Sequence, residues 1–382
     1  MTDQTLFKVP YTKVRDVRTH ANAERLDIVK IYGFDVIVKR DSLKVGDPVI
    51  YTPIDSILPN WLNDRLFPVD SKVKLHNNRI RQIRLRGLAS QGMLINVNDV
   101  KDKIPSYLED EMDLSTYLEI VKYQPPFSGF SQEHQSKVGR SRDRREDHPL
   151  FHSYNGLNAL KWFPDLFRQD EEVHISEKLH GTSARMSNLP FVPDTLWKKI
   201  LKLLKFNPKQ EINYGSNNVQ ISKRSNYKGF YGSDLYGEAF KYCDAVNKIK
   251  ENEIIYGEII GEGIQKNYTY GHKKPHFVLF DVKIYNPEDS TFKWLSPIEV
   301  ELYAIEREFD VVPTLFKGFF RDVNLKKLAS GPSIYESKQN TIEGVVIKSI
   351  DNYNDEYCHS GRRSLKLINE EYLDDKTNTD NH

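Results

Sequence analysis

The 382-residue chain has only two cysteines, Cys243 and Cys358, which are too few for a disulfide framework or a cysteine-based zinc site. It has no run of about 18 apolar residues, so the sequence contains no candidate transmembrane helix. Its first residues lack the basic and apolar pattern of a secretory signal peptide. We therefore expect a cytoplasmic or nucleoplasmic protein that is not secreted and has no membrane partner.

The sequence also lacks an excess of charge of one sign, because its formal net charge is only +1. This small total conceals a segregation of charge along the chain. Residues 72–86, 137–145 and 198–209 carry +6, +4 and +5, so the rest of the chain carries −14. A near-neutral total argues against a nucleic-acid partner, but segregated basic segments make a polyanion partner compatible with the composition. Any single segment is equally well explained as a solvated face.

Length and local composition predict two folded domains and a linker. Residues 1–105 contain short β-branched strands and glycine-bearing turns, a pattern typical of a small all-β barrel. Residues 106–150 become acidic and then polar, which predicts either a solvated tether or a basic arm along a phosphate backbone. Residues 151–382 mix strands and helices. The expected strands are 172–176, 254–260, 277–285 and 344–350, and the expected helices are 154–167, 196–204 and 296–309.

A lysine at the end of an expected strand is the first candidate for chemistry. Lys178 lies in the sequence EKLHGT at 177–182, where Gly181 would let the backbone approach a phosphate closely. A lysine amine attacks only when it is neutral, so a nucleophilic lysine needs nearby cations or a metal ion. This short pattern is weak by itself, and Lys178 alone is as well explained as a surface lysine.

Further charged residues occur in apolar strands downstream. Glu258 interrupts one apolar strand, Glu343 begins another, Lys348 ends that strand, and Lys366 lies between apolar neighbours. Burying a charge is costly without a partner, so such residues indicate a site. Three lysines and two carboxylates predict binding of a triphosphate and a divalent cation. Unrelated surface ion pairs explain any one of these residues but explain the whole series poorly.

The series resembles the motifs of the covalent nucleotidyltransferase superfamily. Residues 177–182 resemble its nucleophile motif in the RNA-ligase form, with His180 where DNA ligases and capping enzymes usually have Asp. Four further segments of this sequence resemble later motifs of the superfamily: Lys223-Arg224-Ser225, 277–281, 343–348 and 364–366. Residues 20–26, 45–47, 52–56 and 86–92 resemble the OB-type domain that precedes the catalytic domain in one branch of ATP-dependent RNA ligases.

This resemblance implies an α+β fold. An OB-like β-barrel (1–105) and a linker (106–150) would precede an adenylyltransferase domain (151–382), an ATP-grasp-like ligase domain of antiparallel sheets and flanking helices. The implied nucleotide is ATP and the implied metal is Mg²⁺, with Mn²⁺ as an alternative. The implied partner is RNA or an RNA-containing duplex with 5′-phosphate and 3′-hydroxyl ends, and no obligate protein partner is indicated.

The resemblance also implies roles for individual residues. Lys178 would attack ATP to form lysyl–AMP, AMP would pass to the 5′-phosphate, and the 3′-hydroxyl would displace it. Phe277 would stack on adenine, and Glu258 would hold either the metal or ribose hydroxyls. The catalytic candidates are Lys178, Lys348 and Lys366, and the metal candidates are Glu258 and Glu343. The nucleotide-binding candidates are Glu177, Lys178, Leu179, Gly181, Arg224, Glu258, Phe277, Glu343, Lys348 and Lys366. The nucleic-acid candidates are Arg79, Arg81, Arg84 and Arg86.

Two alternatives remain open at this point. A capping-type guanylyltransferase is disfavoured by His180 and by the short stretch after Lys366, which has no room for a C-terminal OB domain. A non-catalytic RNA-binding protein on a ligase scaffold is disfavoured by the presence of the whole lysine and glutamate series. His180 itself either assists AMP transfer or has a structural role.

Overall fold

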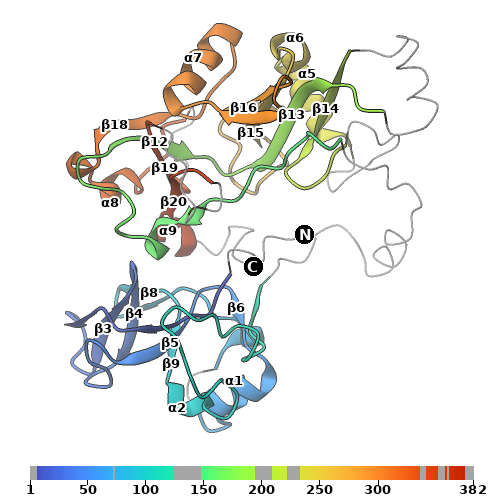
Figure 1. The fold of residues 1–382 in the computed structure, drawn as a ribbon. Coiled ribbons are helices and arrows are strands. Elements are labelled where there is room, and N and C mark those ends of the chain that lie inside the picture. Colours follow the sequence, from blue (N-terminus) through green and yellow to red (C-terminus); the bar gives the residue numbers. More distant parts are fainter. Residues whose placement is uncertain are drawn as a thin grey trace. The chain divides into compact units, whose positions relative to one another are not determined.

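The structure is a computed structural model that describes residues 7–71, 74–123, 148–193, 209–221, 233–335, 341–351, 358 and 361–374. The chain divides into two compact units, which we describe separately (Figure 1). One comprises Met1–Pro125 with Asn158–Leu166, and the other comprises Pro126–Leu157 with Phe167–His382. None of the helices in the described ranges is both long and apolar enough to cross a membrane.

The first unit is built from short antiparallel strands. One sheet has the order β1 (Tyr11–Lys13), β5 (Pro48–Thr52) and β9 (Met93–Ile95), and a second has the order β2 (Asp16–Thr19), β3 (Leu26–Ile31) and β4 (Phe34–Lys39). The smaller pairs are β6 (Ser56–Ile57) with β10 (Val121–Lys122), and β7 (Ile83–Leu85) with β8 (Leu88–Ser90). The short helices are α1 (Asn60–Leu66), η2 (His76–Asn78) and α2 (Val97–Val100). The OB-like prediction is confirmed, although the described strands form separate sheets rather than one closed barrel.

A segment distant in the sequence completes the core of this unit. Trp162 packs against Tyr32, Phe34 and Tyr51, with ring centroids 5.1, 5.1 and 5.4 Å away. The helix predicted over 154–167 is wrong, because this segment contains only β11 (Asn158–Ala159) and the 3₁₀ turn η3 (Leu160–Trp162). The aromatic residues of this segment pack against the strands of the first unit and do not form one face of a helix.

The second unit contains two antiparallel sheets. In one, β12 (Glu172–Lys178) lies between β18 (Thr314–Phe319) and β19 (Gly344–Ser349), and β20 (Ser364–Ile368) follows β19. The other has the order β14 (Gln210–Ser216), β13 (Thr182–Pro190), β15 (Glu253–Ile260), β16 (His276–Asn286) and β17 (Thr291–Trp294). The four strands expected in this part of the sequence are therefore confirmed.

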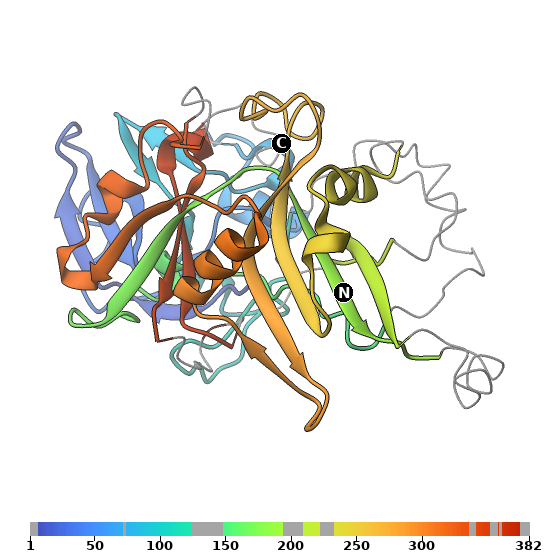
Figure 2. The same ribbon diagram turned by 90° about the horizontal axis from the view of Figure 1, so that it is seen from above.

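Helices cover one face of the second sheet (Figures 1 and 2). Residues of α5 (Leu235–Tyr242), α6 (Ala245–Lys248) and α7 (Pro297–Arg307) join one apolar core with residues of β13, β15 and β16. The helix predicted over 296–309 is confirmed as α7. It begins with a capping box formed by Ser296 and Glu299. The remaining elements are η4 (Phe320–Asp322), α8 (Leu325–Leu328) and α9 (Glu370–Asp374).

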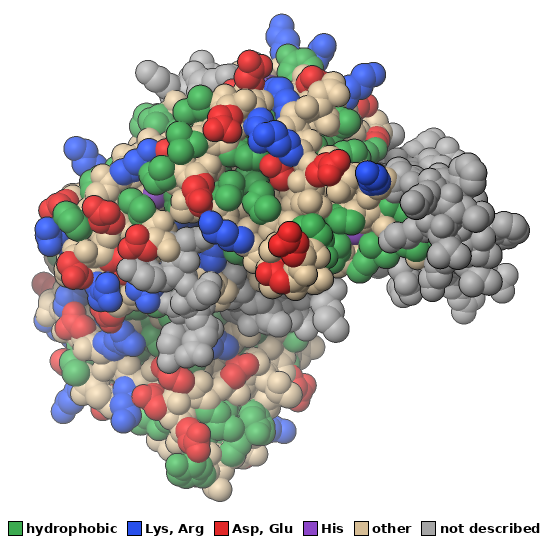
Figure 3. All heavy atoms as spheres, turned by 45° about the horizontal axis from the view of Figure 1, so that its top comes forward, with side chains coloured by type: hydrophobic (Ala, Val, Ile, Leu, Met, Phe, Trp, Pro, Cys, Tyr) green, Lys and Arg blue, Asp and Glu red, His purple; other side chains and the backbone are tan. Residues whose placement is uncertain are grey.

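Much of the charge segregation lies outside the described residues. Residues 137–145 and nearly all of 198–209, including the predicted helix 196–204, are in undescribed ranges. Figure 3 shows acidic, basic and hydrophobic side chains interspersed on the described part of the face that it presents. The predicted linker 106–150 is described only to residue 123 and from residue 148. Its first described part belongs to the first unit instead, because Leu114, Leu118 and Ile120 are buried in the core of that unit and β10 pairs with β6.

Candidate active site

The three predicted catalytic lysines lie on one face of the sheet that contains β12. Lys348 on β19 is directly opposite His174, and Lys366 on β20 is level with Ser176. Directly opposed residues in an antiparallel sheet share a face, and so do residues two apart on one strand. His174, Ser176 and Lys178 therefore share a face of β12 with both other lysines. The structure thus brings Lys178 and Lys366, which are 188 positions apart in the sequence, onto one face.

Lys178 forms a close ion pair at the end of β12. Its Nζ atom lies 2.6 Å from Oε1 of Glu343, the residue immediately before β19. The Glu343 side chain is buried, while the Lys178 side chain is 27% exposed and so is accessible to a substrate. The second carboxylate oxygen of Glu343 is buried without a hydrogen-bond partner. This pair confirms that two of the predicted site residues meet.

Glu177 points away from Lys178, because neighbouring residues of a strand face opposite sides. Its buried carboxylate accepts hydrogen bonds from the Ser333 hydroxyl and from the Ile334 amide at 3.0 Å. Burial raises the pKa of Glu177, although these hydrogen bonds oppose the shift. In this structure the side chain therefore anchors the 333–334 segment behind the site.

His180, two residues after Lys178, is surrounded by tyrosine side chains. Its backbone N–H donates to the Tyr270 hydroxyl at 2.8 Å, and its Nδ1 atom lies 3.1 Å from the Tyr372 hydroxyl of α9. The ring of Tyr268 packs edge-on against the imidazole at 4.8 Å. Nδ1 is also 4.0 Å from the Glu343 oxygen that does not contact Lys178. Leu179 is buried in the same tyrosine-rich cluster.

Gly181 is required at the point where the chain crosses from β12 to the second sheet. A Cβ atom there would lie 2.3 Å from the Ile259 carbonyl oxygen and 2.8 Å from Cγ of Glu258. The Gly181 carbonyl accepts a hydrogen bond from Gln265 at 2.9 Å. The missing side chain therefore allows close packing on β15, and this packing places the Glu258 side chain beside the nucleophile loop.

Lys348 belongs to a buried ionic network with a residue that the sequence analysis did not select. Its Nζ atom is 2.9 Å from both Oδ2 of Asp281 and the Phe280 carbonyl. The same carboxylate accepts hydrogen bonds from Arg362 and, at 2.9 Å, from the Tyr154 hydroxyl. Burial alone would raise the pKa of Asp281, but Arg362 and Lys348 outweigh it and lower the pKa to about 2. Asp281 therefore joins the two sheets as a fixed anion.

The predicted base-stacking residue lies in the core. Phe277 is fully buried between Phe240, Phe309 and Gly257, on the face of β16 that the helices cover. A β-bulge follows, because Leu279 pairs with Gly257 whereas Asp281 pairs with Tyr256. This extra residue turns Asp281 to the face opposite Phe277 and Leu279. In this conformation neither face of the Phe277 ring is accessible for stacking on a base.

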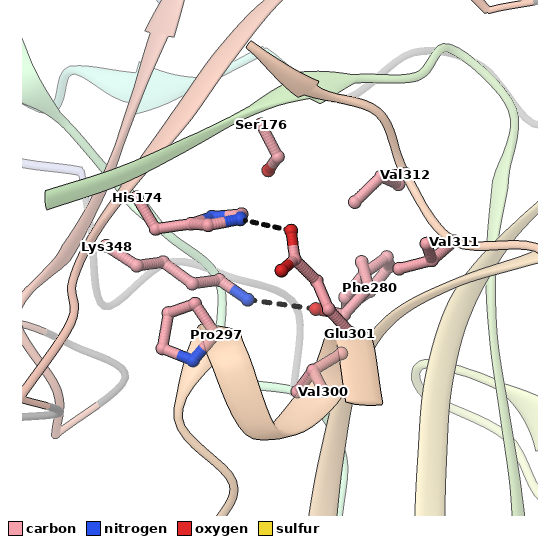
Figure 4. Close-up of a pocket in the computed structure, with 9 residues that line it drawn as sticks. All are labelled: His174, Ser176, Phe280, Pro297, Val300, Glu301, Val311, Val312 and Lys348. Atoms are coloured by element: carbon pink, nitrogen blue, oxygen red, sulfur yellow. Dashed lines mark hydrogen bonds and ion pairs between the residues drawn. The ribbon is translucent and has the colours of Figure 1, made fainter. Parts of the chain in front are cut away.

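Phe280, the extra residue of that bulge, is the aromatic that faces a cavity (Figure 4). The cavity lies against the nucleophile strand and is lined by His174, Ser176, Phe280, Pro297, Val300, Glu301, Val311, Val312 and Lys348. His174 contacts Glu301 at 3.1 Å through Nε2, and burial lowers the pKa of this histidine. The sequence contained the aromatic signal, but the bulge could not be recognised from it.

The remaining predicted residues have different surroundings. Arg224 lies outside the described residues. In the first unit, Arg79 is buried, donates to Asp55 at 2.6 Å and stacks over the Tyr123 ring at 3.5 Å, so it supports the fold. In contrast, Arg81, Arg84 and Arg86 are exposed on or beside the β7–β8 hairpin.

The protein side chains at this site could supply only part of the coordination sphere of a divalent cation. Within the described ranges, no three His, Cys, Asp or Glu side chains are grouped to hold a metal ion. The buried, unpaired oxygen of Glu343 is nevertheless a suitable hard ligand. Water and substrate oxygens would have to complete the coordination, which is usual for Mg²⁺.

Comparisons with known proteins agree with this architecture. The RNA ligase family matches residues 171–368, and an OB-fold domain family matches residues 9–97. A solved Naegleria gruberi RNA ligase with PPi is 23% identical, with a TM-score of 0.68 over 96% of this chain and 97% of that chain. A mutant of that ligase with ATP and Mn is 21% identical, with a TM-score of 0.68 over 96% and 98%. A comparison with curated sequences found no match.

The OB-fold match lies within the first unit, and the RNA ligase match lies within the two-sheet unit, where Lys178 ends β12. The family match extends over more than half of the chain and includes Lys178, Glu258, Glu343 and Lys366. This chain belongs to the RNA ligase family.

Proposed function

We propose that this protein is an ATP-dependent RNA ligase that joins a 5′-phosphate end to a 3′-hydroxyl end at breaks in RNA-containing duplexes. The observation that carries the proposal is the accessible Lys178 paired with Glu343, on a face shared with Lys348 and Lys366. Similar Naegleria gruberi structures contain ATP and Mn, AMP and Mn, or PPi, which supports ATP as the nucleotide. We assign the reaction to the cytoplasm or nucleoplasm.

In the first step, the Lys178 amine attacks the α-phosphorus of ATP. A P–N bond forms, the bond between the α-phosphorus and the bridging oxygen breaks, and pyrophosphate leaves with the displaced negative charge. The ion pair with Glu343 holds the amine in place but also favours its protonated form. Before Lys178 can attack, its ammonium proton must therefore pass to the Glu343 carboxylate or to water.

In the second step, a 5′-phosphate oxygen attacks the lysyl–AMP phosphorus, and Lys178 leaves as the amine. In the third, the 3′-hydroxyl attacks the activated 5′-phosphate, a phosphodiester forms, and AMP leaves. Both steps are phosphoryl transfers, for which positioning and charge neutralisation supply most of the catalysis. Lys366 shares the Lys178 face and is the candidate for contacting the transferred phosphate, as is Lys348 if it exchanges Asp281 for the nucleotide.

Glu343 and Glu258 are the side chains that would hold a divalent cation. When bound, Mg²⁺ or Mn²⁺ would neutralise phosphate charge. Glu343 offers its unpaired oxygen, and Glu258 lies beside Gly181 on β15. Phe280, rather than Phe277, is our candidate for packing against the base, because the bulge in β16 keeps it out of the helix-covered core in which Phe277 is buried.

The division of labour between the parts of the chain is also a proposal. We assign RNA binding to residues 1–105, connection to the part of 106–150 that follows β10, and catalysis to 151–382. Arg81, Arg84 and Arg86 are the OB-domain candidates, because their exposed guanidinium groups can reach phosphates. Replacing Arg84 and Arg86 together by glutamate should leave lysine adenylylation unchanged while lowering nick sealing.

The direct test is incubation with α-labelled ATP and Mg²⁺, followed by detection of an acid-labile adduct on the protein. We expect labelling of the wild type and of Lys293→Ala, whose side chain is 73% exposed on β17, but none of Lys178→Ala. Labelling by GTP instead of ATP would indicate a guanylyltransferase. Equal labelling of Lys178→Ala, or none of the wild type, would refute the ligase proposal.

A further inference from the structure

Lys283 on β16 is a half-buried cation without an acidic partner in the part of the chain that the structure describes. Its Nζ atom lies 3.3 Å from Nδ1 of His152 and over the rings of Trp294 and Phe292, at 4.8 and 4.9 Å from their centroids. By contrast, Lys293 on the adjacent strand has an acidic partner, Glu299, at 3.5 Å.

Lys283 is on the side of the sheet that faces the active site. It is two residues beyond Asp281, whose carboxylate contacts Lys348, so both side chains leave β16 on the same face. Lys348 is level with His174, which lies four residues before Lys178 on β12. At about 3.3 Å per residue, Lys283 is on the order of 20 Å from the nucleophile along these strands.

The surroundings of Lys283 carry more positive than negative charge. Arg362 stacks on the same Trp294 ring at 4.0 Å, and Arg185 stacks on Phe151 at the same distance. Asp281 is the buried carboxylate of this region, and both Lys348 and Arg362 already pair with it. Burial, and secondarily Arg362, lowers the pKa of Lys283. An anion beside Lys283 would relieve this repulsion.

We propose that Lys283, together with His152, binds a backbone phosphate of the RNA strand whose end lies at Lys178. The aromatic rings below Lys283 restrict the direction of its ammonium group, which donates to Nδ1 of His152, so the second donor group is the Nε2–H of this imidazole. Because Lys283 and Lys178 lie on strands of different sheets, the contact would fall some nucleotides away from the reacting end. The proposal rests on the ligase function and assigns part of its RNA-binding surface.

A phosphate contact explains the geometry better than base stacking does. Trp294 is contacted by Arg362, Lys283, Tyr154 and Tyr256, so its ring is occupied by protein groups. Phe292 is similarly packed against His152 and Tyr285. The group left to meet a ligand is the ammonium, which as a point charge suits a phosphate.

The test compares Lys283→Met with Lys293→Met. Methionine keeps an unbranched apolar chain on the rings and removes the charge, and Lys293 is a control on the same hairpin. Binding is measured with a nicked RNA duplex carrying a 5′-phosphate, without ATP, across a salt series. For Lys283→Met we expect about fivefold weaker binding and a log–log salt slope smaller in magnitude by about 0.7–0.9. Lys283→Arg should retain both values.

Lysine adenylylation by labelled ATP separates the two proposals. Loss of labelling in the wild type would defeat the ligase proposal, whereas normal labelling of Lys283→Met is expected here. Unchanged affinity and salt slope in Lys283→Met, or equal losses in Lys293→Met, would overturn the phosphate site. An increased KM for ATP in Lys283→Met would also overturn it, because the contact would then belong to the nucleotide.

Discussion

Two lysines on the same face of one sheet, Lys178 and Lys348, are each paired with a carboxylate, yet the two pairs differ in every other respect. Lys178 is 27% exposed and contacts Glu343, whose second oxygen has no hydrogen-bond partner. Lys348 is 9% exposed and shares Asp281 with Arg362 and Tyr154. When the first pair opens, the Lys178 ammonium can be solvated although Glu343 stays buried, whereas opening the second pair leaves both charges buried. One sheet thus combines an accessible lysine, the proposed nucleophile, with a buried lysine.

The largest effect should come from removing the anion of the buried pair. Asp281→Ala leaves Lys348 and Arg362 facing each other without compensation, which we expect to cost about 3–5 kcal/mol in the free energy of unfolding. Urea denaturation monitored by circular dichroism measures this cost. The comparison fails if Asp281→Ala is no more destabilising than Glu343→Ala.

The next effect concerns the accessible pair and should appear in activity rather than in stability. Glu343→Gln keeps the side-chain shape but removes the charge near Lys178, so we expect adenylylation to slow about 10²–10³-fold. The unfolding free energy should change by about 1 kcal/mol or less, because Lys178 can be solvated. Single-turnover labelling and urea denaturation provide the two measurements. A large loss of stability with normal labelling would reverse the assigned roles.

The two ion pairs should also differ in how they affect the stability of the fold at low pH. The pKa of Asp281 is about 2 in the fold and 3.8 in the unfolded reference, so its ionised form stabilises the fold. This contribution, about 2 kcal/mol, is fully present above pH 4 and is lost as the pH falls towards 2. We expect wild-type stability to fall more steeply over this window than that of Asp281→Asn. Parallel curves would contradict the charge assigned to Asp281.

The smallest effect tests a contact between α9 and the loop after Lys178. Tyr372→Phe removes the hydroxyl 3.1 Å from His180 Nδ1 but keeps the ring. We expect a roughly fivefold loss in a single-turnover step of ligation, the equivalent of about 1 kcal/mol. Tyr268→Phe is the matched control, because its ring also packs on His180 while its hydroxyl contacts the Thr341 carbonyl. Equal losses in both variants would mean that packing, not the hydroxyl, positions His180.

Much of this arrangement could be predicted, since charged residues in apolar strands identified Lys178, Glu343 and Lys348 before any geometry was available. The same signal, a charge in an apolar strand, is present at Asp281 within Phe277-Val278-Leu279-Phe280-Asp281. The opposite directions of Glu177 and Lys178 also follow from strand alternation.

Other features depended on tertiary structure. The bulge in β16 changes which face each later residue occupies, so neither the burial of Phe277 nor the position of Phe280 can be obtained by counting residues. The segment around Trp162 was predicted as a helix because it is rich in apolar residues. In the structure Trp162 instead contacts residues that lie 100 or more positions earlier in the sequence. Arg79 looked like its exposed neighbours because its partner, Asp55, is distant in the sequence.

The close contact at Gly181 has a mechanical consequence. The chain passes between the sheets there with no space for even one carbon atom beside the Ile259 carbonyl. A shift of β15 would therefore be transmitted through the backbone to Lys178, only three residues away. Substrate-induced movement of the second sheet would reach the nucleophile directly, whereas a methyl group at position 181 would displace it permanently.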